Sequence, residues 1–82
     1  MTNPILLSLR RDQTDRLWQA WTLAEARAYE ARADACLAAA AYYAAVGARE
    51  QAGEATEEAA RLRQEAHLTL SMGDEPRPGG GT

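Results

Sequence analysis

Small and apolar residues recur at alternating spacings of three and four residues along most of this sequence. Such spacing is typical of one face of a helix that packs along another helix. Alanine fills most of these positions, and its small side chain lets two helix backbones approach closely. The first row is Leu17, Trp21, Ala24, Ala28, Ala31, Ala35, Ala38, Tyr42 and Ala45, and the second is Ala48, Ala52, Ala55, Ala59, Leu62 and Ala66. We therefore predict an all-α fold, an antiparallel Ala-rich helical hairpin with Gly47 at its turn and these two rows in contact.

Helix start and stop signals divide residues 1–72 into three predicted helices. Asn3 and Pro4 suit the start of a short N-terminal helix over residues 4–10, because asparagine caps helices and proline favours the first helical position. The polar residues 11–15 interrupt the apolar pattern, so a long helix is expected over 14–46 and a third over 48–71. One continuous helix from Pro4 onward is the alternative, since no glycine or proline forbids it. We expect Gly73 to close the last helix and residues 73–82 to form a disordered tail.

Composition argues against several classes of function. The net charge of -3 does not favour a general nucleic-acid binder. The single cysteine, Cys36, and the single histidine, His67, are expected far apart along the hairpin, so they form no catalytic dyad. We expect no catalytic residues, no cofactor and no metal site, and hence no enzyme. No apolar run approaches the length of a membrane span or of a signal-peptide core, and we expect a cytoplasmic protein.

Length decides which part of the hairpin lacks an internal partner. The second long helix is shorter than the first and folds back only to about Ala24 at equal rise per residue. The larger apolar residues before that point form the predicted partner-binding set, in which Trp18 and Trp21 share one helix face. This set is Ile5, Leu6, Leu9, Leu17, Trp18 and Trp21. In the alternative, the N-terminal residues fold back and bury both indoles in a small internal core.

The expected function is a non-enzymatic interaction or assembly module, of the kind found among accessory proteins of phages and mobile elements. Its partner is another protein or a second copy of the chain, which would form a helical bundle by self-association. Arg10, Arg11 and Arg16 form the one basic cluster. A nucleic-acid or membrane-surface binder that uses this cluster is the alternative function, which Asp12 and Asp15 weaken electrostatically.

The stretch from residue 40 to 59 resembles a single tetratricopeptide repeat unit. The matching positions are the family's small residue, tyrosine, turn glycine and two packing alanines, here Ala40, Tyr43, Gly47, Ala52 and Ala59. The chain departs from that pattern at Cys36, Ala39, Thr56 and Gln64. The resemblance implies a helix–turn–helix hairpin. It implies no peptide-binding groove, because one unit cannot form the concave surface of a repeat array.

Overall fold

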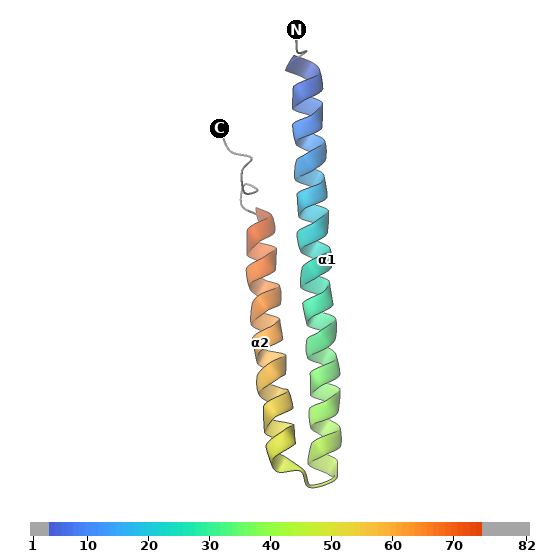
Figure 1. Ribbon diagram of the computed structural model, residues 1–82, viewed down its shortest axis with the longest axis vertical. Helices are drawn as coiled ribbons and strands as arrows, with labels where there is room; N and C mark the ends of the chain where they lie inside the picture. The colour runs from blue at the N-terminus through green and yellow to red at the C-terminus, as the bar shows by residue number, and fades with distance from the viewer. Residues whose placement is uncertain (1–3, 75–82) are drawn as a thin grey trace.

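Two antiparallel helices joined by a short turn form the hairpin, in agreement with the predicted fold class. The computed structural model describes the backbone of residues 4–74 and the side chains of residues 11–74. Helix α1 spans Pro4–Ala45 and helix α2 spans Arg49–Asp74. The helices lie side by side, and the N-terminal part of α1 extends beyond the end of α2 (Figure 1). The molecule is a rod with extents of 69 × 17 × 13 Å.

The turn is built on Gly47, whose backbone has a φ of 82°. This left-handed conformation is one that glycine adopts without steric cost. The amide of Gly47 donates to the Ala44 carbonyl at 3.2 Å, and the amide of Ala48 donates to the Tyr43 carbonyl at 2.8 Å. These two bonds form a Schellman motif, which satisfies carbonyls left free at the end of α1. The turn is thus the one that the sequence predicts.

The predicted break between residues 10 and 14 is wrong, because α1 runs without interruption from Pro4 to Ala45. The hydroxyl of Thr14, the first residue of the expected second helix, donates to the Arg11 carbonyl at 2.9 Å. A threonine that bonds back to the preceding turn is compatible with a continuing helix. With no glycine or proline in the interval, the backbone has no local reason to leave the helix. A separate helix over 4–10 therefore does not form.

The predicted end of α2 is also wrong, because Gly73 lies within the helix and Asp74 is its last residue. Gly73 serves a packing purpose rather than a terminating one. A β-carbon placed on Gly73 would lie 2.5 Å from Oγ1 and 3.3 Å from Cβ of Thr22. Because Gly73 has no side chain, α2 can approach α1 closely at this point, and the contact between the two helices extends to Thr22. Residues 75–82 of the predicted tail lie outside the described residues.

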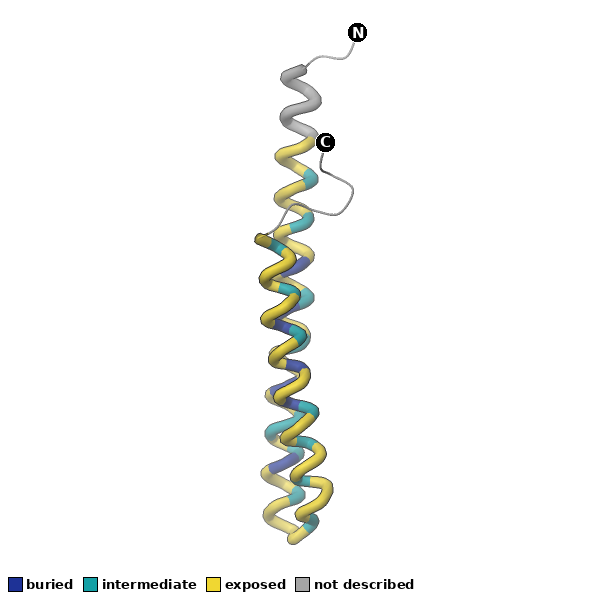
Figure 2. Tube along the Cα trace, turned by 90° about the vertical axis from the view of Figure 1, so that its left-hand side faces the viewer, coloured by how far each residue is buried: buried dark blue, intermediate teal, exposed yellow. Residues whose placement is uncertain are grey.

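The α2 side of the helix contact is the predicted row. All of its members are buried or half-buried, and Ala59, Leu62 and Ala66 are the most buried residues of α2. Figure 2 shows the buried residues of both helices along the strip where α2 lies over α1. The row from Ala48 onward therefore packs against α1, as its spacing predicts.

The α1 side of the contact is not the predicted row, every member of which is exposed. A second row with the same alternating spacing is buried or half-buried instead: Thr22, Ala26, Tyr29, Ala33, Cys36, Ala40 and Tyr43. The Schellman turn explains the choice, because it ties Ala48, the first residue of the α2 row, to the carbonyl of Tyr43. The turn thereby directs the Tyr43 face of α1 toward α2 and leaves Tyr42 outside.

The core is thin and consists mostly of alanine. Ala33, Ala59 and Leu62 form its centre, and Tyr29, Cys36 and Leu37 pack against them. Among the described residues, Leu62 is the only buried aliphatic side chain larger than alanine. Close approach of the two backbones therefore contributes much of the packing, and Leu62 contributes most of the side-chain bulk.

Two helical glycines of α2 are expected to respond in opposite ways to replacement by alanine. Gly53→Ala should raise the free energy of unfolding by about 0.5–1 kcal/mol, because a β-carbon there meets nothing within 4 Å. Gly73→Ala should lower the free energy of unfolding by about 1 kcal/mol, because the clash with Thr22 outweighs the stabilisation that alanine gives over glycine inside a helix. Urea denaturation followed by circular dichroism measures both changes.

The contact between Thr22 and Gly73 can be isolated in a double mutant. In a Thr22→Ala background the Oγ1 atom that meets the new β-carbon is absent, so Gly73→Ala should become neutral or stabilising. Equal destabilisation by Gly73→Ala in both backgrounds would show that Thr22 does not set the approach of the helices at this point.

Candidate interaction surface

The two tryptophans lie together near the free end of α2 but differ in exposure. Their ring centroids are 5.2 Å apart with an interplanar angle of 37°. Trp18 is half-buried, and its indole N–H donates to the Met72 carbonyl at 3.2 Å. The Trp21 side chain is 51% exposed. Trp18 thus belongs to the contact between the helices, and Trp21 faces outward.

The overhang is shorter than the sequence predicts, since pairing with α2 does not stop at Ala24. Thr22 is buried beside Gly73, and Trp18 reaches Met72. The extension follows from the longer α2, which ends at Asp74. The prediction that both indoles lack an intramolecular partner therefore fails for Trp18, which has one on α2.

The row that the sequence places at the helix contact instead forms an exposed apolar strip along α1. We name it the outer stripe: Leu17, Trp21, Ala24, Ala28, Ala31, Ala35, Ala38, Tyr42 and Ala45. At 3.6 residues per turn it lies roughly 150° around α1 from the buried row. Large side chains stand at its two ends, with Leu17 61% exposed and Tyr42 64% exposed. Between Trp21 and Tyr42 the stripe is alanine alone.

Charged residues flank the middle of the outer stripe on both sides. Arg27 and Asp34 each precede a stripe alanine and lie along one flank, whereas Glu25 and Arg32 each follow a stripe alanine and lie along the other. The Arg32 guanidinium lies over the Tyr29 ring, 5.8 Å from its centroid. Asp34 and Arg63 form an ion pair of 3.7 Å between largely exposed side chains. Within the described part of the chain, Glu25 and Arg27 make no ion pair.

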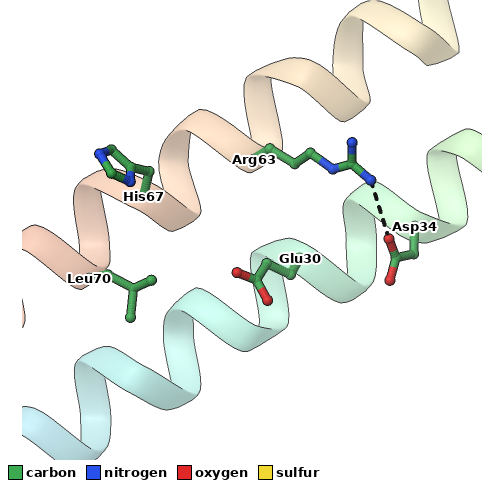
Figure 3. A pocket seen from close by; sticks show the side chains of 5 residues that line it. All are labelled: Glu30, Asp34, Arg63, His67 and Leu70. Atoms are coloured by element: carbon green, nitrogen blue, oxygen red, sulfur yellow. Dashed lines mark ion pairs between the residues drawn. The ribbon is translucent and has the colours of Figure 1, made fainter.

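An open groove of about 390 Å³ lies along one side of the hairpin. Figure 3 shows Glu30 and Asp34 projecting from α1 toward Arg63 and His67 on α2, with Leu70 at one end. The four polar side chains belong to exposed residues, and the Asp34–Arg63 pair, drawn as a dashed line, is the one ion pair among these four. A neighbouring groove of about 330 Å³ includes Leu23, Leu70 and Gly73. Both grooves are wide open to solvent.

The predicted N-terminal site residues are only partly described. Arg11 and Arg16 are exposed, as a basic surface requires. The side chains of Arg10, Ile5, Leu6 and Leu9 lie outside the described residues. Leu17 is exposed and is the first residue of the outer stripe. Leu17 and Trp21 are therefore the described members of the predicted partner-binding set that face away from α2.

The groups with potential for chemistry are separated. Cys36 packs against the core cluster, whereas His67 lines the groove beside Glu30. Within residues 11–74, no three histidine, cysteine or carboxylate side chains gather as metal ligands would. Neither described helix has a stretch long and apolar enough to cross a membrane.

The shorter of the two ion pairs between described residues lies on the solvent side of α2. The Arg61 Nε atom donates to the Glu58 carboxylate at 3.0 Å. This hydrogen bond holds the pKa of Glu58 below its usual value and raises the pKa of Arg61. Because both side chains are well exposed, water screens the pair and it contributes little to stability.

No protein-family model, curated protein or solved structure matches this chain. The tetratricopeptide-like spacing of residues 40–59 thus remains a resemblance in sequence. The outer stripe is the feature that the structure adds. The spacing identifies the residues of this stripe, but the prediction that they face α2 is wrong.

Proposed function

We propose that this chain is a non-enzymatic protein–protein interaction or assembly module that binds through the outer stripe. The observation that carries the proposal is the exposure of a continuous apolar row along α1, with Leu17, Trp21 and Tyr42 as its largest members. Small folded proteins seldom leave a long apolar strip in water unless a partner covers it.

The chemistry of the stripe suits a helical partner. An alanine surface is nearly flat and lets another helix approach to the lower end of the usual 8–10 Å interaxial range. Trp21 supplies an amphipathic anchor of the type that dominates binding energy at interfaces. Because α1 already exists as a helix held by α2, binding does not require the stripe to fold first, which lowers the entropic cost.

Site-specific photo-crosslinking in native host cells tests this function. A benzoylphenylalanine probe in place of Tyr42 should crosslink to a protein, because that position lies on the stripe and is 64% exposed. The matched control is the same probe in place of Leu68, which is also exposed but lies on α2. Crosslinks to a discrete protein from position 42 and not from position 68 are expected.

Trp21→Ala should then reduce crosslinking at position 42. Truncation of an anchoring indole commonly costs more than about 2 kcal/mol, or about 30-fold in affinity. Circular dichroism checks that the variant remains helical, which the exposure of Trp21 leads us to expect. Equal crosslinking from positions 42 and 68, or none from either, would contradict the proposed function.

A further inference from the structure

We propose that the occupant of the outer stripe is the outer stripe of a second copy of this chain, paired antiparallel in a single register. This inference rests on the proposed function and specifies its partner. In this register a two-fold axis passes between Ala28 and Ala31 of both chains. Leu17 faces the partner's Tyr42, Trp21 faces the partner's Ala38, Ala24 faces the partner's Ala35, and Ala28 faces the partner's Ala31.

The sizes of the stripe residues fit this arrangement. The central layers contain only alanine, so the two α1 backbones can approach closely. Trp21, the largest stripe residue, meets the small side chain of the partner's Ala38. Leu17 and the partner's Tyr42 close the contact at each end, where both side chains are otherwise exposed. Helix α2 lies roughly on the opposite side of α1 and leaves the approach free.

The flanking charges are complementary in this register. In an antiparallel helix pair, residues on the same flank face each other, and their charges set orientation and register. Arg27 then lies opposite the partner's Asp34 on one flank, and Glu25 lies opposite the partner's Arg32 on the other. Because the dimer has a two-fold axis, each of these two ion pairs forms twice. Glu25 and Arg27, which make no ion pair in the described part of the hairpin, both gain one.

The same charges disfavour the competing arrangements. A parallel pairing of the stripes would place Arg27 beside the partner's Arg32, twice. An antiparallel pairing displaced by one heptad would bring Glu25 against the partner's Glu25 and Arg27 against the partner's Arg27. A displacement by one heptad in the opposite direction would bring Arg32 against the partner's Arg32 and Asp34 against the partner's Asp34. Like charges directly opposed across an interface are destabilising, so the pattern selects one register.

Sedimentation equilibrium and a charge exchange test the pairing on the full chain. The wild-type chain should sediment as a dimer. Arg32→Glu should weaken the dimer at least about tenfold, because it opposes the partner's Glu25 twice. Adding Glu25→Arg should restore affinity to within about threefold, because the two charges are exchanged and the pairs re-form. The matched control is Arg49→Glu, which reverses the same charge at an exposed position at the start of α2 and should leave dimerisation unchanged.

Spin labels measure the orientation directly. In a Cys36→Ala background, a nitroxide on Glu50→Cys lies next to the turn. Antiparallel pairing places the two turns at opposite ends, about 50 Å apart at 1.5 Å rise per residue, whereas parallel pairing places them side by side. A double electron–electron resonance distance near 50 Å is expected, and a distance under about 30 Å would overturn the proposal.

The remaining outcomes separate this inference from the function on which it rests. A monomer at high concentration, with crosslinks from position 42 to a different protein, would overturn self-pairing and leave the interaction function standing. A dimer that Arg32→Glu does not weaken would overturn the register. Absence of both a dimer and a crosslink would overturn the two proposals together.

Discussion

Replacing Leu62 by alanine is expected to remove most of the stability of the hairpin. Leu62 is 5% exposed and fills the centre of a core that otherwise consists mainly of alanine. Truncation of a buried leucine costs about 2–5 kcal/mol, because apolar contacts are lost and a cavity remains. A chain of this size buries little surface and has little stability in reserve. Thermal unfolding at low micromolar concentration, followed by circular dichroism at 222 nm, measures the loss.

Leu68→Ala provides the matched control for Leu62→Ala. It removes the same atoms from the same helix, but Leu68 is 50% exposed. In a domain of this size, each kcal/mol lowers Tm by about 4–8 °C. Leu62→Ala should therefore lower Tm far more than Leu68→Ala does. Equal decreases would mean that Leu62 does not form the core that its burial indicates.

Enlarging Ala59 is expected to destabilise the hairpin by the opposite mechanism. Ala59 is 1% exposed and lies in the core cluster with Ala33 and Leu62. A leucine there has no space unless the helices separate, and overpacking of this kind costs about 1–3 kcal/mol. Ala59→Leu should lower Tm by about 4–8 °C for each kcal/mol, measured in the same way.

The neighbouring residue is the control for Ala59→Leu. Ala60 is exposed on the same helix turn, so Ala60→Leu adds the same side chain in water. Its effect should be within about 0.5 kcal/mol of zero, as is usual for surface substitutions. If both variants unfolded at the same temperature, contact between the helices at Ala59 would not be close.

Local features of the fold could be predicted from the sequence with good accuracy. The helical character of both segments follows from a composition rich in alanine, leucine, glutamate and arginine. Gly47 marks the turn because it is the residue there that adopts a positive φ without cost. The prediction that the row from Ala48 to Ala66 packs against α1 is confirmed, because the opposite face of α2 is strongly polar and the helix has one apolar side.

Features that depend on contacts across the hairpin could not be predicted in the same way. The continuation of α2 past Gly73 depends on the space that Thr22 needs, and those residues are far apart in the sequence. The hydrogen bond from the Trp18 indole to the Met72 carbonyl forms because the longer α2 brings that carbonyl within reach. For the candidate site, the sequence indicated Leu17 and Trp21 but not the length of the surface to which they belong.

The sequence by itself determined the helical character of the chain, its one turn and the apolar face of α2, but it predicted a separate helix over 4–10 that is part of α1. It could not determine the face of α1 that meets α2, because α1 carries two rows with the same alternating spacing. The tertiary structure decided between them. The hydrogen bonds of the turn fix the rotation of α1 about its axis, so the row that includes Tyr29, Cys36 and Tyr43 packs against α2. The alanine-rich row is thereby left facing water and available to a second chain.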